Sequence, residues 1–168
     1  MKVYVLYLYH FCQIILQVYT IHAIDKKKDV QTGLLDVVIS SKPSETGGLR
    51  EIVYAAVGAR TMVTVNIDVS DGLANGVCGT VVGVCTTGDT VQTILVEFDS
   101  DRVGKQAISN SQHKSRYPKA VPITRQDVQF FTGRGRRSVE AKRTQFPLTL
   151  AWACTIHKVN ACNHINLT

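Results

Sequence analysis

The sequence predicts a mainly β fold with some α-helix. Runs dense in β-branched residues lie at 59–67, 77–85 and 91–98, and such residues favour strands. Asp71-Gly72 and Asn75-Gly76 separate the first two runs, and a short polar stretch separates the second from the third. Asn and Gly tolerate the positive φ angles that tight turns need. Three short strands joined by tight turns are typical of a curled antiparallel sheet.

The size and composition of the chain allow one packed domain, or a domain with fragments of others. Of its 168 residues, 45% are hydrophobic, so a packed core is expected and disorder is not. The formal net charge of +6 is unevenly placed, because residues 101–143 hold eleven Lys and Arg against three acidic residues, a net charge of +8. This asymmetry predicts a localised surface that faces a polyanion. The alternative is a solvated basic face without a partner.

The first segment, residues 1–24, is rich in Val, Leu, Ile and Tyr. A secretory signal is one interpretation, because Lys2 precedes an apolar stretch and a loose cleavage site ends at Ala23. A buried strand or helix, or the arbitrary start of a truncated gene model, are the others, and we favour truncation. Polar residues interrupt the run, which argues against a membrane span.

The next elements are a linker and the three β runs. Residues 40–48 are rich in turn formers and predict an exposed loop. Alternation within the first β run predicts one face that is turned toward the core. That face consists of Thr61, Val63, Val65 and Ile67. In the second run, Gly79 and Gly83 predict bulges or a corner where the sheet bends.

Shorter elements follow the third β run. Residues 102–119 are polar and basic without periodicity, and they predict a long surface loop. Short strands are expected at 120–123 and 128–131, and a further strand at 139–146. Pro122 cannot donate a hydrogen bond to a neighbouring strand, so the first of these strands is expected at an edge of its sheet.

The last segments combine basic and apolar residues. Residues 133–137 read Gly-Arg-Gly-Arg-Arg and predict a flexible basic turn. Pro147 marks a boundary, and Thr149 is expected to cap a helix that runs through Trp152 to Lys158.

The five cysteines include no Cys-x-x-Cys pair, which favours reduced thiols over a disulfide framework. Cys154, His157, Cys162 and His164 lie close together in the sequence. Their spacing matches none of the common zinc patterns, so no metal site is expected.

Three blocks of the sequence carry a resemblance to a known family. The first covers 57–68 and 70–82, the second joins 95–99 and 102–104 to 121–123, and the third covers 146–158. The third block sets an apolar run against the polar string Thr-Ile-His-Lys at its end. Together the blocks resemble the Pif family of DNA helicases, the superfamily 1B motors that include the helicase of Helitron transposons. The resemblance spans roughly residues 19–158.

The resemblance implies a fold and a domain organisation. In the family, the 2B insert is a small barrel of the Src-homology-3 type, and the third block returns the chain to the second RecA-like α/β motor domain. Five segments are therefore expected along the chain. They are an apolar leader or truncated motor-domain remnant at 1–24, a linker and entry to the 2B region at 25–55, a 2B-type β-barrel with basic loops at 56–136, a return strand and helix of the RecA-like domain at 137–160, and a divergent tail at 161–168.

The resemblance also implies a partner and a set of binding residues. In the family, the third block contacts single-stranded DNA, and the matching positions here are Thr155, His157 and Lys158. Hydroxyl and cationic donors at one helix end suit successive phosphates. Three guanidinium groups of the basic turn are added as candidate phosphate contacts, although such turns are also common solvated loops. These are Arg134, Arg136 and Arg137. Neither a small-molecule substrate nor a membrane is expected as a partner.

The sequence also departs from the family pattern. It contains no Gly-x-x-x-x-Gly-Lys-Ser/Thr loop, which would hold the ATP phosphates and the Mg²⁺ ion. After Val159, Asn160 and Ala161 stand where the family has Gln and Gly. We therefore expect a fragment of an ATP-dependent 5′-to-3′ DNA helicase that grips single-stranded DNA and helps to separate strands, but is inactive alone.

This expectation includes no catalytic residue and no cofactor for the chain itself, while the complete family enzyme uses ATP and Mg²⁺. The resemblance implies a nuclear protein with roles in DNA repair, recombination and telomere maintenance. The alternatives are a non-catalytic nucleic-acid-binding module and, as a minor one, a secreted small β protein.

Overall fold

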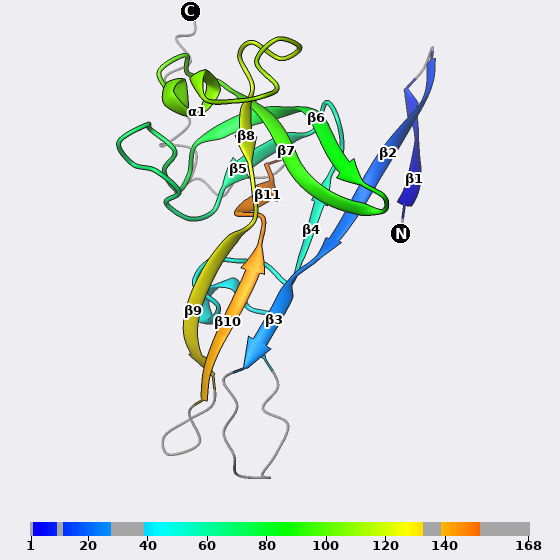
Figure 1. Cartoon of the computed structure of the whole chain (residues 1–168). Coiled ribbons are helices and arrows are strands. Elements are labelled where there is room, and N and C mark those ends of the chain that lie inside the picture. Colours follow the sequence, from blue (N-terminus) through cyan, green and yellow to red (C-terminus); the bar gives the residue numbers. More distant parts are fainter. Residues whose placement is uncertain (1, 10–11, 28–38, 133–138, 152–168) are drawn as a thin grey trace, which may run out of the picture.

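The computed structural model describes residues 2–9, 12–27, 39–132 and 139–151, which form three antiparallel sheets (Figure 1). The first has the order β1-β2-β4, built from β1 (Lys2–Tyr9), β2 (Cys12–His22) and β4 (Ile52–Ala55). The second has the order β3-β10-β9, built from β3 (Ile24–Lys27), β10 (Val139–Gln145) and β9 (Gln126–Thr132). The predicted mainly β fold is confirmed.

The third sheet has five strands in the order β11-β5-β6-β7-β8. Its strands are β5 (Arg60–Val63), β6 (Cys78–Thr87), β7 (Thr90–Phe98), β8 (Val121–Ile123) and β11 (Leu148–Leu150). The short helix α1 (Lys105–Ser109) lies beside it, and we call this sheet with α1 the body. The largest apolar cluster lies here, with Val63, Ile94, Val96, Val121 and Phe146 among its fully buried members.

Glycines allow the β6–β7 hairpin to bend, as predicted. A Cβ atom at Gly79 would lie 2.6 Å from the carbonyl oxygen of Glu97, so only glycine fits this close approach of two strands. At Gly83 the pairing of β6 with β7 shifts register, which is the signature of a bulge. The turns predicted at Gly72 and Gly76 are also present, with φ angles of 77° and 95°.

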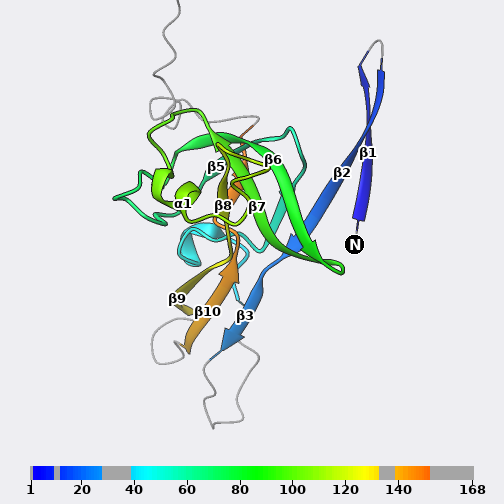
Figure 2. The same ribbon diagram turned by 45° about the horizontal axis from the view of Figure 1, so that its top comes forward.

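The second sheet extends from the body as a separate arm, which we define as β3, β9 and β10 (Figures 1 and 2). The chain passes between the arm and the other sheets four times. It leaves β2 for β3 at Ala23, enters β4 from residues 39–51, leaves β8 for β9 at residues 124–125, and returns from β10 to β11 at residues 146–147. Residues 39–51, which include the 3₁₀ helix η1 (Pro43–Glu45), lie against one face of the arm.

The structure corrects the expected alternation of the first β run. Strand β5 ends at Val63, and the consecutive residues Thr61, Met62 and Val63 are all buried. Side chains on both faces of β5 are therefore buried: Thr61 and Val63 as predicted, and also Met62, which the alternation assigned to the other face. Pro122 does lie in an edge strand, as predicted, because β8 ends this sheet.

Two predictions about helices were wrong. Residues 102–119 are not only a loop, because they contain α1. Thr149 does not cap a helix, because it lies in β11 opposite Met62. The backbone carbonyl of Pro147 accepts a hydrogen bond of 2.9 Å from the N–H of Thr64, so the residues after the proline pair with β5. Residues 152–158 of the predicted helix lie outside the described residues.

Candidate nucleic-acid interface

All six residues predicted to contact DNA lie outside the described residues. Arg134, Arg136 and Arg137 fall between β9 and β10. Thr155, His157 and Lys158 follow β11. The strands that lead to both segments are described, so their starting points are known: one is the far end of the arm, and the other is the edge of the body at β11.

The described residues contain a second basic segment, the connection between β7 and β8. We define the basic connection as residues 102–119. Its five basic side chains are exposed, and none forms an ion pair with another described residue. They are Arg102, Lys105, Lys114, Arg116 and Lys119. A cluster of exposed, unpaired cations on one connection is a physical basis for attraction to a polyanion.

The carboxylate of Asp71 fixes the start of α1 in this connection. It accepts hydrogen bonds from the backbone N–H groups of Gln106 (3.0 Å) and Ala107 (2.9 Å), and the backbone carbonyl of Asp71 accepts one from Gly104 (2.7 Å). These bonds satisfy the donors that a helix start leaves open. Gly104 has a φ of 72°, and a Cβ atom there would lie 2.2 Å from Val121. The basic connection is thereby held against the body.

The second half of the basic connection packs on β6. Tyr117 lies against Gly83, where a Cβ atom would come within 3.2 Å of the tyrosine ring. The guanidinium carbon of Arg116 lies 5.4 Å from the centre of the same ring, which orients the arginine by a cation–π contact. His113 lies 3.9 Å from the sulfur of Cys85. The cations of this half are therefore displayed on a backbone that is tied to the sheet.

Carboxylates limit the positive field near α1. A pocket of about 330 Å³ lies beside the helix, and Glu97 and Asp101 line it together with Lys105 and Lys119. Both signs of charge thus meet at this pocket, so the attraction for an anion is weaker there. Lys114 and Arg116 do not line the pocket. These two are the best candidates for phosphate contacts in the described part of the basic connection.

Several other cations counted in the basic segment serve the structure instead. Arg143 is only 1% exposed and forms a bidentate ion pair with Asp25, with N···O distances of 2.8 and 2.7 Å. Its guanidinium also donates to the Thr46 hydroxyl and to the carbonyls of Leu49 and Ser40. The charge pattern of the sequence assigned Arg143 to a polyanion-facing surface, and its burial corrects that assignment.

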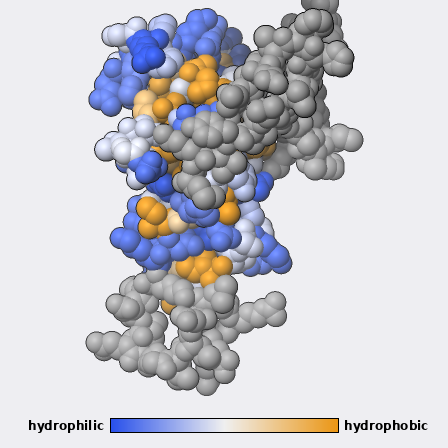
Figure 3. Space-filling view, turned by 90° about the vertical axis from the view of Figure 1, so that its right-hand side faces the viewer, coloured by the Kyte–Doolittle hydropathy of each residue, from blue (hydrophilic) through white to orange (hydrophobic). Residues whose placement is uncertain are grey.

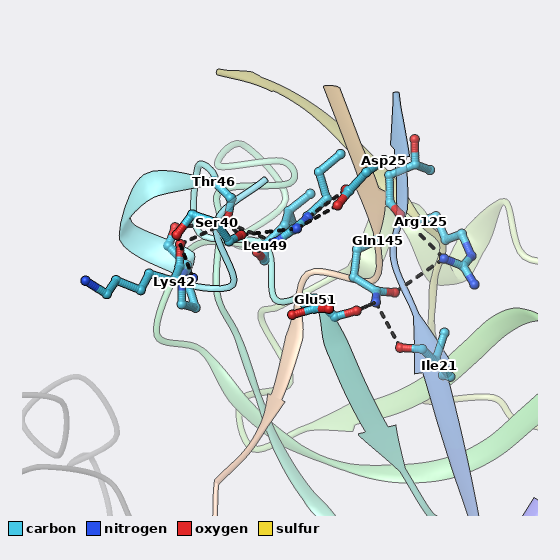
Figure 4. A network of polar contacts seen from close by, with 12 residues as sticks. Ile21, Asp25, Ser40, Lys42, Thr46, Leu49, Glu51, Arg125 and Gln145 are labelled. Carbon is cyan, nitrogen blue, oxygen red and sulfur yellow. Dashed lines mark hydrogen bonds and ion pairs between the residues drawn. The ribbon is translucent and has the colours of Figure 1, made fainter. Parts of the chain in front are cut away.

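The place where the arm meets the other sheets is a network of polar contacts, which we call the joint (Figure 4). The buried amide of Gln145 donates to the carbonyls of Ile21 (3.0 Å) and Glu51 (3.3 Å). Arg125 donates to the carbonyl of His22 (3.1 Å) and lies over the ring of Phe146 at 5.1 Å. Partial burial lowers the pKa of Arg125 from its ordinary value. These bonds involve residues at all four chain crossings, and they tie the arm to β2 and to the residue before β4.

The described residues show neither a metal site nor a membrane span. They place no group of three or more His, Cys, Asp or Glu side chains where a metal ion could be held. Within the same ranges, no helix has the length and apolar character needed to cross a bilayer. The cysteines and histidines near the end of the chain that the sequence analysis weighed as a zinc site lie outside the described residues.

Comparison with solved structures finds a similar fold in part of several Pif1 helicases. For the crystal structure of Pif1 helicase from Candida albicans, the match covers 86% of this chain and 31% of the Pif1 chain. The identity is 21% and the TM-score is 0.52. Unliganded Pif1 from Bacteroides sp matches 85% of this chain and 35% of its own, with 24% identity and a TM-score of 0.49. For Pif1 from Bacteroides in complex with ADP-AlF3 and ssDNA, the match covers 83% of this chain and 25% of the Pif1 chain. The identity is 24% and the TM-score is 0.48.

The chain spans about a quarter to a third of the length of these structures. No protein-family model matches it, and a search of the curated proteins found no match. The argument about fold depends on the Candida albicans structure, whose TM-score exceeds 0.5. The predicted resemblance to the Pif family is confirmed in the fold, which is that of a portion of a Pif1-like helicase.

Proposed function

We propose that this chain is part of an ATP-dependent 5′-to-3′ DNA helicase, in which it grips single-stranded DNA and helps to separate the strands. The observation that carries the proposal is the fold shared with part of the Pif1 helicase from Candida albicans. The exposed cations of the basic connection add a described surface with the charge that a DNA backbone requires.

The proposal assigns finer parts of the fold. Residues 56–136, which hold strands β5 to β9 and helix α1, correspond to the 2B insert and its small barrel of the Src-homology-3 type. Strand β11 and the residues after it correspond to the return into the RecA-like motor domain. DNA contacts are then proposed at two places besides the basic connection. These are Thr155, His157 and Lys158 after β11, and Arg134, Arg136 and Arg137 between β9 and β10.

ATP and Mg²⁺ belong to the complete helicase in this proposal. The 168 residues contain no loop that could hold the ATP phosphates, so this chain alone is expected not to hydrolyse ATP. A nuclear location follows from the same proposal. If this chain, purified free of other ATPases, hydrolyses ATP, the proposal that ATP hydrolysis requires the complete helicase is contradicted.

Two double variants with the same change in charge test the DNA contact. Lys114→Gln/Arg116→Gln removes two cations of the basic connection, and Lys42→Gln/Arg50→Gln removes two exposed cations elsewhere. We expect wild-type protein to bind a labelled single-stranded oligonucleotide, with affinity that falls as salt rises. The first double variant should bind more weakly, and its salt slope should be shallower by about 1.4, at about 0.7 for each lost phosphate contact.

The control variant should keep both the wild-type affinity and the wild-type slope. Equal losses in the two variants would show that only net charge matters and that the basic connection makes no specific contact. Absence of binding by the wild-type protein would overturn the proposed function itself.

A further inference from the structure

The arm has one covered face and one open face. Alternation along β9 leaves Phe131, Gln129 and Asp127 exposed, while Phe130 and Val128 are partly buried on the other side. The covered face packs on residues 39–51, where a Cβ atom at Gly47 would lie only 2.2 Å from Val128. Arg143 of β10 points to this same side through its bonds to Thr46 and Leu49. On the opposite face, the side chains of Asp127, Gln129 and Phe131 are exposed.

The strand register defines the residues of this outer face. Phe131 and Gln129 of β9 pair with Glu140 and Lys142 of β10, and Lys142 pairs with Lys26 of β3. We define the outer face as Phe131, Gln129, Lys142 and Lys26. On the side of the molecule that Figure 3 shows, the surface over the arm is mainly hydrophilic, with separate apolar patches.

Phe131 is the clearest feature of the outer face. Its side chain is 73% exposed, more than any other large apolar side chain among the described residues. An aromatic ring in water contributes nothing to the core, and aromatic residues lie most often in buried positions or at interfaces. An exposed ring on a flat sheet face is instead a platform on which a partner ring can stack.

Two lysines lie near Phe131 on the outer face. Lys26 and Lys142 lie directly opposite each other on neighbouring strands, where like charges repel. Asp127 pairs with Lys142 at 2.6 Å, and the hydrogen bond from that lysine is the main cause that lowers the pKa of Asp127, with Lys26 adding to it. Asp127 thus pairs with Lys142, and no ion pair joins Lys26 to another described residue. Glu140, opposite Phe131, has a contact of its own. Lys26 is exposed and free to meet a further anion such as a phosphate, and Lys142 can join it by turning from Asp127.

We propose that the outer face binds single-stranded nucleic acid, with one base stacked on Phe131 and a neighbouring phosphate held by Lys142 and Lys26. This inference extends the proposed function by naming a contact surface for the unpaired strand. Diagonal neighbours on paired strands lie about 7–8 Å apart, so the ring of Phe131 and the ammonium of Lys142 can reach a base and a phosphate of one strand. Stacking requires an unpaired base, and the face therefore selects single strands over duplex.

Substitution of Phe131 by alanine tests the stacking contact. The matched control is Tyr54→Ala, because Tyr54 is also an exposed aromatic, 49% exposed, but lies on β4 in another sheet. We expect Phe131→Ala to lower the affinity for a labelled single-stranded oligonucleotide by about 5- to 100-fold, without a change in salt slope. Tyr54→Ala should bind as wild type does. Thermal melting of both variants checks that each remains folded.

Two further variants separate stacking from charge. Phe131→Trp keeps a ring at the position, so it should retain binding, and its fluorescence should be quenched when the oligonucleotide is added. Lys26→Gln/Lys142→Gln should make the salt slope shallower by about 1.4 for two lost phosphate contacts. Binding to a blunt duplex should be the same in Phe131→Ala and in the wild type.

The outcomes distinguish this inference from the proposed function. If wild-type protein binds single strands and Phe131→Ala binds equally well, or if Tyr54→Ala loses as much affinity, the outer face is not the contact surface and the proposed function stands. If the wild-type protein does not bind single strands, both the proposed function and this inference fail.

Discussion

Replacement of Arg143 by methionine should destabilise the protein strongly. The guanidinium is 1% exposed and donates five hydrogen bonds, two of them to the carboxylate of Asp25. Methionine fills much of the same volume but leaves that carboxylate without its partner. Removal of one partner of a buried ion pair costs about 3–5 kcal/mol. The side chain of Asp25 is 25% exposed, so water can partly replace the arginine, and we expect about 3 kcal/mol.

Urea unfolding measures this loss. With a denaturant dependence of about 2 kcal/mol per molar urea, the midpoint should fall by about 1.5 M. The neighbouring residue provides the control, because Lys142 pairs with Asp127 on the exposed side of the same strand, where the two side chains are 41% and 53% exposed. Such a pair is largely screened by water, so Lys142→Met should move the midpoint far less. Coincident midpoints for the two variants would refute the account of Arg143 as the buried link between the arm and residues 39–51.

Three further predictions follow from single contacts. Asp71→Ala removes the acceptor at the start of α1 and should lower the free energy of unfolding by about 1 kcal/mol. Amide exchange in Lys105–Ser109 should become faster, and unchanged protection would contradict this prediction. Gly79→Ala places a Cβ atom 2.6 Å from the Glu97 carbonyl oxygen and should lower the free energy of unfolding by about 1–3 kcal/mol, measured with urea. A wild-type midpoint would show that β6 and β7 move apart at this point without cost. The lowered pKa of Asp127 means that its contribution to stability is complete above its ordinary value of 3.8 and is lost as the pH falls through the lower folded value. Urea midpoints measured down to about pH 2 should therefore fall less in Asp127→Asn than in the wild type, and equal falls would contradict the shift.

The sequence predicts those elements of the fold that depend on local signals. The β6–β7 hairpin follows from two β-branched runs and a glycine-containing turn, and the bend at Gly83 follows from the glycine itself. The turns at Gly72 and Gly76 depend on positive φ angles, which glycine adopts without the steric cost that other residues have. Pro122 lies in an edge strand because it lacks a donor, which is again a property of one residue.

The elements that the sequence did not predict depend on contacts between distant residues. Helix α1 forms where Asp71, from a turn 35 residues earlier, accepts the first N–H groups of the helix. Thr149 lies in a strand because β5 supplies a free edge, although Pro147 and Thr149 together read as a helix start. Arg143 is buried because Asp25, 118 residues away in the chain, supplies the countercharge. No local pattern contains this information.

The candidate site was predictable only where local composition defines it. The excess of basic residues located the basic connection, but only the structure separates its exposed cations from Arg143 and Arg125, which have partners within the fold. Phe131 was assigned to a strand without a function, because exposure on one face of a sheet depends on what covers the other face. The residues that family resemblance assigned to DNA contact stay predictions, because they lie outside the described residues.

The measurement that tests the central claim most directly is the affinity of the wild-type chain for a single-stranded oligonucleotide over a range of salt concentrations. Contact between phosphates and three to five exposed cations predicts that log K falls linearly with log salt, with a slope of about −2 to −3.5. Tighter binding to the single strand than to a duplex of the same length should accompany it. A slope near zero, or no binding at low salt, would contradict the account of this chain as the DNA-gripping part of a helicase.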